Sequence, residues 1–83
     1  MSSVIVSGHA DSRPVISNQF PSNWELSSTR AVNVVKYMLA ASKLSPEQFS
    51  AVSYAEFHPI ADNDSVEGMA KNRRVDFIIH LKQ

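Results

Sequence analysis

The residues of this sequence with the clearest potential for chemistry follow a short apolar run. Gly8-His9-Ala10-Asp11 follows Val4-Ile5-Val6 after one residue, Ser7. Such a run is typical of a buried strand, and ligand groups gather at the carboxyl ends of strands in open α/β sheets. Asp11 is therefore the first candidate for a binding group. In a turn, a carboxylate also commonly caps the turn or pairs with a nearby cation, here Arg13.

His9 and Asp11 form a His-x-Asp pair, which can bind a metal ion or serve a hydrolase. A small metal-assisted hydrolase would need a third group, and His58 is the candidate, with Asp62 or a serine as other choices. None of these stands at a diagnostic spacing. The hydrolase is therefore the alternative hypothesis, and a packed, hydrogen-bonded His9 is the simpler one.

A cationic cluster, Lys71-Asn72-Arg73-Arg74, lies near the end of the sequence. Cations near the carboxyl end of a helix are stabilised by its dipole, so position alone can explain the cluster. Acidic residues lie just upstream, and over the whole chain eight Lys and Arg balance eight Asp and Glu. Because nucleic acid binding needs a basic surface, we expect no nucleic-acid partner.

Length and composition limit the architecture that can position these groups. Eighty-three residues, 43% of them hydrophobic and 19% charged, predict a single small folded domain over residues 1–83. Without cysteine there is neither a disulfide framework nor a thiolate metal site. No apolar run approaches the roughly 20 residues of a membrane helix, and no secretory signal is visible. Membrane contact is expected only through a segment upstream of this sequence.

Hydrophobic periodicity predicts three strands, over 4–8, 50–54 and 75–81, and one long helix between the first two. Because a helix connects the first two strands, they should run parallel with a right-handed crossover. Shorter helices are expected after Pro46 and over 64–72. This order of elements predicts an α/β fold with a small sheet.

The long helix is expected to begin after Ser22, in a capping box in which the Ser22 hydroxyl accepts a hydrogen bond from the Glu25 N–H. Apolar residues at intervals of three and four then give the helix a stripe that faces the core. The residues expected in the hydrophobic core are Trp24, Val35, Met38, Phe77 and Ile79.

Several motifs follow one another along nearly the whole chain. They are Gly8-His9-Ala10-Asp11, Asn23-x-x-Leu26-Ser27-x-x-Arg30-Ala31-x-x-Val34, Ser53-Tyr54-Ala55-Glu56 with Pro59, Asn63, Gly68 and Asn72-Arg73-Arg74-Val75. In order and spacing they resemble the OmpA-like peptidoglycan-binding domain. The segment Phe20-Pro21-Ser22-Asn23-Trp24-Glu25-Leu26-Ser27 resembles flagellar motor stator proteins of the MotB type still more closely. The resemblance implies an OmpA-like α/β sandwich, with a small mixed sheet and one long and one or two short helices on one side.

The resemblance also implies a noncatalytic cleft, without a cofactor, for the peptide stem of peptidoglycan and typically for its diaminopimelate. In that family the aspartate of the first motif, here Asp11, meets the free ammonium of the ligand. The arginine of the second motif, here Arg30, pairs with the adjacent carboxylate. Asn23 and Arg73 match further ligand-contacting positions.

One anionic and one planar cationic side chain can satisfy both poles of a zwitterion through charge-assisted hydrogen bonds. Arg30 lies near the third turn after Ser22, so its side chain can reach back toward Asp11. Alternatively, Asp11 and Arg30 form a salt bridge with each other. A ligand could still exchange for that pair, because a partly exposed pair contributes only about 0–1 kcal/mol.

The sequence departs from the family pattern at four positions. Ala10 replaces a threonine, Ser53 and Ala55 replace glycines, and Met69 replaces a common arginine. These changes bear on loop geometry and affinity, because alanine lacks a hydroxyl and both serine and alanine resist positive φ.

Family members have a further strand and helix before the first motif, for which this chain has no room. We therefore expect an exposed apolar sheet edge, and either self-association through it or a chain cut at its amino terminus from a longer protein. By resemblance, the expected location is the periplasm, as part of an inner-membrane-anchored protein. The expected partners are peptidoglycan and either a second copy, as a homodimer, or a larger stator complex.

Overall fold

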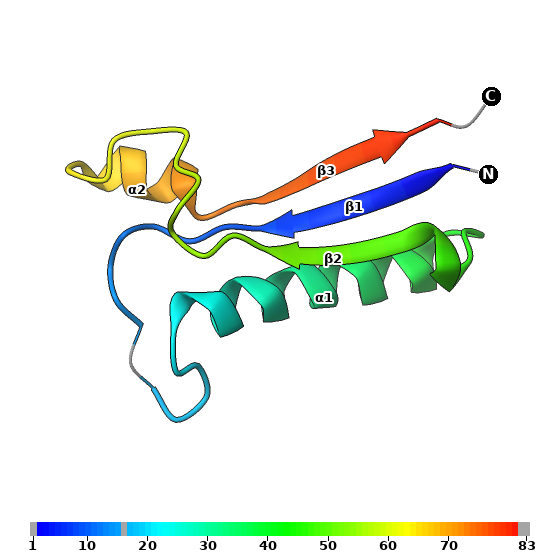
Figure 1. Cartoon of the computed structure of the whole chain (residues 1–83), viewed down its shortest axis with the longest axis horizontal. Coiled ribbons are helices and arrows are strands. Elements are labelled where there is room, and N and C mark those ends of the chain that lie inside the picture. Colours follow the sequence, from blue (N-terminus) through cyan, green and yellow to red (C-terminus); the bar gives the residue numbers. More distant parts are fainter. Residues whose placement is uncertain (1, 16, 82–83) are drawn as a thin grey trace.

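The computed structural model describes residues 2–15 and 17–81, which form three strands and two α-helices (Figure 1). In chain order the elements are β1 (Ser3–Gly8), α1 (Asn23–Ala41), a 3-10 turn (Pro46–Gln48), β2 (Phe49–Ser53), α2 (Val66–Asn72) and β3 (Val75–His80). The predicted α/β class and order of elements are confirmed, with ends shifted by one or two residues. In the described part of the chain, neither helix is long and apolar enough to cross a bilayer.

β1 is the central strand of a mixed sheet with the order β2-β1-β3. It runs parallel to β2, with Val4 opposite Phe49 and Gly8 opposite Ser53, and antiparallel to β3. The parallel pair is the one predicted from the helical crossover. The carboxyl ends of β1 and β2 and the amino end of β3 therefore meet at one edge of the sheet, where β1 leads into the Gly-His-x-Asp motif.

The hydrophobic core lies between α1 and one face of the sheet (Figure 1). Val4 and Val6 of β1 and Ala31 of α1 are buried there. The partly buried residues that pack against them are Val34, Val35, Phe49 and Val75. Because so few side chains are fully buried, each of them carries a large share of the small stability that a domain of this size can reach.

α1 begins at the predicted cap, Ser22, although the hydrogen bonds differ from those predicted. The Ser22 hydroxyl accepts from the Trp24 N–H at 3.2 Å, where the sequence predicted the Glu25 N–H. The same hydroxyl donates to the Glu25 carboxylate. A hydroxyl can accept and donate at once, so the cap is still made, and Glu25 supports it through the side chain of Ser22.

Two residues of β3 that were predicted in the core are instead exposed, Phe77 by 49% and Ile79 by 60%. They lie on the same face of the sheet as Val6 and Val4, their partners across the β1–β3 pair. However, α1 packs on β1 and β2, so this face of β3 stays open. The alternation along β3 identified the apolar face correctly, but not whether another element covers it.

The third core prediction that is wrong is Trp24, which is 47% exposed. The hydroxyl of Ser53, the last residue of β2, donates to the Trp24 carbonyl at 2.9 Å, which places the first turn of α1 level with the end of the sheet. The indole ring therefore reaches the loop after β2 and packs against Phe57, with 5.6 Å between ring centroids. Val35 packs against the core, and Met38 is half-buried.

The close approach of β1 to α1 depends on Gly8. A Cβ atom at this position would overlap the backbone carbonyl of Ser27, which is held within the helix. We predict that Gly8→Ala lowers the free energy of unfolding, measured by urea denaturation, by about 3 kcal/mol. Ser50→Ala, at an exposed position of β2, should change it by less than about 0.5 kcal/mol. Equal effects of the two substitutions would contradict the close approach.

Candidate functional site

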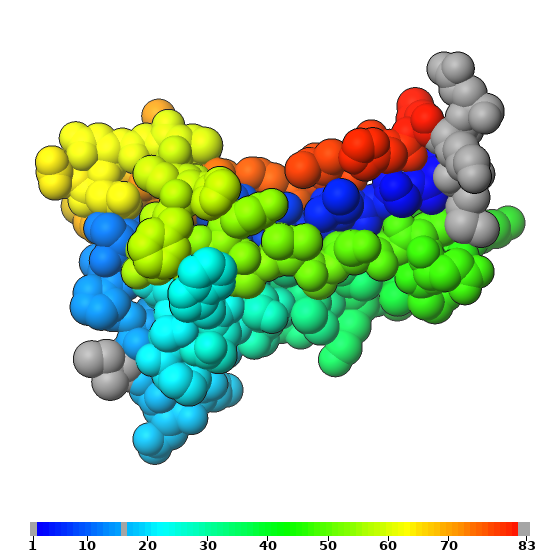
Figure 2. Space-filling view, viewed as in Figure 1, coloured from blue at the N-terminus to red at the C-terminus, as the bar shows by residue number. Residues whose placement is uncertain are grey.

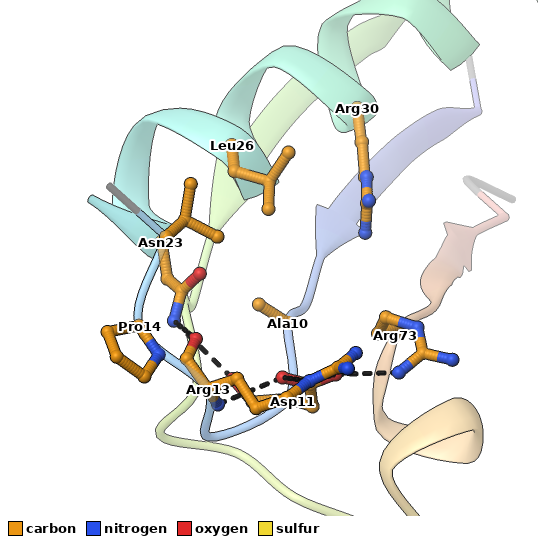
Figure 3. A pocket seen from close by; sticks show the side chains of 9 residues that line it. Ala10, Asp11, Arg13, Pro14, Asn23, Leu26, Arg30 and Arg73 are labelled. Atoms are coloured by element: carbon orange, nitrogen blue, oxygen red, sulfur yellow. Dashed lines mark hydrogen bonds and ion pairs between the residues drawn. The ribbon is translucent and has the colours of Figure 1, made fainter. Parts of the chain in front are cut away.

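A hollow of about 270 Å³ lies at the carboxyl end of β1, beside the first turns of α1 and the end of α2 (Figure 3). It contains all four residues that the family resemblance implies as ligand contacts, which are Asp11, Asn23, Arg30 and Arg73. The other residues that line it are Ala10, Arg13, Pro14, Val15 and Leu26. The fold thus brings the residues of three separate motifs into one space.

Asp11 is buried at the floor of this hollow, and two arginines neutralise its carboxylate (Figure 3). Arg13 donates from Nη2 to Oδ2 at 2.7 Å and from its backbone N–H to Oδ1 at 2.9 Å. Arg73 donates from Nη1 to the same Oδ2, also at 2.7 Å. The pairing of Asp11 with Arg13, the simpler interpretation of the sequence, is confirmed. Within the described residues, no ion pair joins Asp11 to Arg30.

These contacts keep Asp11 charged. Hydrogen bonds from the Arg13 side chain lower the pKa of Asp11 most strongly, and the hydrogen bond from Arg73 adds to this. Burial of the carboxyl acts in the opposite direction but is outweighed, so the pKa lies far below its ordinary value. The floor of the hollow is therefore a fixed negative charge at any pH near neutrality.

Arg30 projects from α1 into the same hollow, and its guanidinium does not reach Asp11 (Figure 3). Its side chain is exposed, and it forms no ion pair with any residue that the structure describes. With Arg13 and Arg73, three guanidinium groups and one carboxylate line the hollow. The hollow thus has an excess of positive charge, which favours ligands with carboxylate groups.

Asn23 is buried in the first turn of α1 and holds the loops around the hollow together. Its Nδ2 donates to the carbonyl of Arg13 at 3.0 Å and to the carboxylate of Glu56 at 3.3 Å. Nδ2 also donates to the carbonyl of Asp11, at the longer distance of 3.4 Å. The amide hydrogens of Asn23 are therefore used within the protein, where they fix the loop that carries Asp11 and Arg13.

Asn72, fully buried at the end of α2, positions Arg73. Its Oδ1 accepts from the two backbone N–H groups of residues 60 and 61, at 2.8 and 3.0 Å. Its Nδ2 donates to Oδ1 of Asn63 at 2.8 Å, and that oxygen also accepts from the Ser12 N–H at 3.3 Å. This chain of hydrogen bonds ties α2 to the loop that follows Asp11. Of the cationic cluster predicted at this helix end, only Arg73 lines the hollow.

From the sequence, Arg13 was expected only as an ion-pair partner, and Glu56 had no assigned role. Arg13 also lines the hollow, and Glu56 accepts a hydrogen bond from Asn23, which lines the hollow too. The spacing of Arg13 from Asp11 was a usable signal, because a side chain two residues after an aspartate can close a turn onto its carboxylate. Nothing local in the sequence connects Glu56 to Asn23.

The loop after β2 has a left-handed residue that is not glycine. Ala55 has φ of 52°, is 1% exposed, and its carbonyl accepts from the Ala10 N–H at 2.8 Å. A non-glycine residue in this region costs about 1–2 kcal/mol. Ala55 therefore adopts the positive φ that its side chain resists, and its burial and its hydrogen bond to the Gly-His-x-Asp loop offset the strain.

The geometry does not support the alternative of a metal-assisted hydrolase. Asp11 lines the hollow beside α1, whereas His9 and His58 line a separate one. Among residues 2–15 and 17–81, no three His, Cys, Asp or Glu side chains lie close enough to hold a metal ion.

Fold and site together describe a small α/β domain with a charged hollow where the strand ends meet. The sequence profile described as the OmpA family matches residues 1–73, and the chain therefore belongs to the OmpA family. It is 45% identical over 76 residues to Motility protein B of Bacillus subtilis, covering 92% of this chain and 29% of that protein. It is 42% identical over 74 residues to Outer membrane porin F of Pseudomonas fluorescens, covering 88% of this chain and 21% of that protein. The chain thus spans less than a third of the length of these relatives.

Solved structures of similar proteins confirm the OmpA-like fold and the resemblance to MotB. The C-terminal domain of Helicobacter pylori MotB has a TM-score of 0.88 and 35% identity, over 99% of this chain and 61% of that one. A structure described as the cell wall anchor of the T6SS from Pseudomonas aeruginosa has a TM-score of 0.84 and 39% identity, over 99% of this chain and 56% of that one.

The pairing of Asp11 predicts a pH-dependent part of the stability. Because its pKa is lower in the folded than in the unfolded chain, the carboxylate stabilises the fold above about pH 4 and loses this contribution progressively below it. We expect Asp11→Asn to lower the free energy of unfolding by about 2 kcal/mol near pH 7 and clearly less near pH 3, measured by urea denaturation. Asp64→Asn, which removes an exposed carboxylate, is the control. An Asp11→Asn effect of the same size at both pH values would contradict the pairing.

Proposed function

We propose that this chain is a noncatalytic domain that attaches a flagellar motor protein or another envelope protein to peptidoglycan. The observation that carries the proposal is the hollow in which Asp11 and Arg30, from different elements, face the same space. Similar proteins support it, because one is Motility protein B and another is described as a cell wall anchor. The proposed setting is the periplasm, within an inner-membrane-anchored protein and a larger stator complex, since similar solved structures include the periplasmic domain of Helicobacter pylori MotB.

The proposed ligand is the peptide stem of peptidoglycan, held at the zwitterionic end of diaminopimelate. Asp11 would accept hydrogen bonds from the ammonium, and the planar guanidinium of Arg30 would bind the adjacent carboxylate. Arg73 pairs with Asp11 and adds positive charge to the hollow, while Asn23 holds the loop that carries Asp11 and Arg13.

In this proposal the ammonium replaces Arg13 on Asp11. Both arginines bind Oδ2, but the side chain of Arg13 is 59% exposed and that of Arg73 is 35% exposed. Arg13 makes more hydrogen bonds to Asp11 than Arg73 does, but water hydrates its exposed guanidinium once it is released and so compensates part of their loss. The exchange leaves the buried carboxylate paired throughout, and it frees Arg13 to meet a further carboxylate of the peptide stem.

We predict that Arg30→Ala weakens binding to a diaminopimelate-containing muropeptide by about 2–4 kcal/mol, or about 30- to 1000-fold in Kd. The loss follows from removing the cation that meets the ligand carboxylate. Calorimetric titration gives the Kd, and cosedimentation with insoluble peptidoglycan gives a second readout. The fold should be unaffected, because the Arg30 side chain is exposed.

Lys36→Ala is the matched control, since it removes one exposed positive charge from the same helix outside the hollow. It should leave the Kd unchanged within about twofold. If both substitutions weaken binding equally, only general charge attraction contributes. If neither substitution changes the Kd, Arg30 does not contact the ligand.

We also propose that copies of this chain associate through β3, as a homodimer. Among the described residues no strand pairs with the outer edge of β3, and Phe77, Ile78, Ile79 and Leu81 on or beside it are exposed. An unpaired apolar strand is a template for another strand, and two copies can meet there around a two-fold axis.

Sedimentation velocity tests this association. We expect a dimer fraction that grows between micromolar and millimolar protein and that falls in Ile79→Lys, because a charge on an edge strand opposes pairing. Tyr37→Lys places the same charge on an exposed position of α1 and should leave the dimer intact. A compact monomer at every concentration would refute self-association through β3.

A further inference from the structure

A second hollow, of about 470 Å³, lies on the face of the sheet opposite α1. Its place follows from the alternation of side chains, since Val6 faces α1 and its neighbour Ser7 must face the other way. Ser7 is paired with Asp76 of β3, and His9 and Tyr54 continue the same hollow beyond the strand ends. β3, β1 and β2 are open to view side by side in Figure 2, with α1 along their lower border. No residue of the Asp11–Arg30 hollow lines this one.

Two buried polar groups in this hollow have no hydrogen-bond partner among the residues that the structure describes. They are Oγ of Ser7 and Nδ1 of His9, and the two residues are only 2% and 4% exposed. The other ring nitrogen of His9, Nε2, lies 3.4 Å from Oδ2 of Asp76. Buried polar groups nearly always have partners, so two such groups in the wall of one hollow indicate a ligand that supplies them.

The charges of the hollow cancel. Arg74 donates from Nε to Oδ2 of Asp76 and from Nη2 to the carbonyl of His58, both at 3.0 Å. Burial lowers the pKa of His9, and the nearby charge of Arg74 acts in the same direction, while Asp76 opposes both. His9 is therefore neutral near pH 7. A cavity with hydrogen-bonding groups and no net charge favours a neutral polar ligand over an ion.

Aromatic rings form one wall of the hollow. His9 and Tyr54 are stacked, with 5.3 Å between ring centroids and 19° between planes, and His58 leans against Tyr54 at 4.2 Å. Ile78 adds apolar surface on the side of β3. Ring faces of this kind pack against the apolar side of a ligand. The ligand must therefore have an apolar face and, at its edge, groups that hydrogen bond with Ser7 and His9.

We propose that this second hollow binds a neutral saccharide ring. A pyranose has a face of C–H groups that can stack on the Tyr54–His58 wall and hydroxyl groups at its edge. One of them can donate to Nδ1 of His9, and another can exchange a hydrogen bond with Oγ of Ser7. A sugar within a wall glycan strand and a free sugar offer the same chemistry. The site is independent of the peptide-stem proposal, because the two hollows share no residue.

The test is an NMR titration of the whole nitrogen-15-labelled chain with two probes, the tetramer of β-linked N-acetylglucosamine and maltotetraose. We expect saturable shifts at Ser7, His9 and Tyr54, with Arg30 unmoved. Shifts with the first probe alone would identify a wall-type glycan as the source, and shifts with both would identify saccharides in general. Absence of saturable shifts with either probe up to about 50 mM would overturn the proposal.

Two substitutions connect the shifts to the hollow without endangering the fold. Ser7→Ala removes a hydroxyl that bonds to nothing in the described protein, and His58→Ala removes an exposed ring. We expect each to raise the Kd for the saccharide about tenfold. Ser50→Ala, which removes an exposed hydroxyl from β2, should leave it unchanged. An unchanged Kd in both Ser7→Ala and His58→Ala would refute the site, and muropeptide binding through Arg30 would be unaffected by that result.

Discussion

The buried carboxylate of Asp11 is the constraint on which the arrangement of the site depends. A charge so deeply buried must keep a charged hydrogen-bonding partner, because its desolvation would otherwise oppose folding. Arg13 and Arg73 both supply one, each at 2.7 Å, and both reach solvent. The carboxylate can therefore exchange one cation for another without ever being left unpaired. A site with this property is suited to recognising an ammonium group while the protein keeps its fold.

The rest of the fold holds this carboxylate and its surroundings in place. β1 lies in the middle of the sheet and delivers the Gly-His-x-Asp loop to the edge where the ends of all three strands meet. Asn23 fixes that loop to α1, and Asn72 fixes the end of α2 close to it. Since strand ends meet at this edge, both hollows lie there, one beside α1 and one on the open face of the sheet.

Periodicity and capping residues were enough to predict the order of elements and the parallel pair, because these depend on local patterns and on the connection through one helix. The pairing of Asp11 with Arg13 was visible for the same reason, since the residues are two apart. From the residues alone Arg73 was visible only as part of a cationic cluster, and its place in the site came from the family resemblance. The exposure of Phe77 could not be predicted, because alternation defines a face of β3 and not what covers it. The positive φ of Ala55 could not be predicted either, because it depends on a hydrogen bond from a loop distant in the sequence, and local propensities do not include such a contact.

The most direct test of the central claim follows the side chains of the site during titration with a diaminopimelate-containing muropeptide. The NMR signals to record are the carboxyl carbon of Asp11 and the Nε–H groups of Arg13 and Arg30. If the ammonium replaces Arg13 on Asp11, all three signals shift together and saturate at one concentration, with Arg13 changing because it leaves the carboxylate. A muropeptide whose free amine is acetylated should not displace Arg13. Saturable binding that leaves Asp11 and Arg30 unshifted, or that is unchanged by acetylation of the amine, would mean that these two side chains do not hold the ligand.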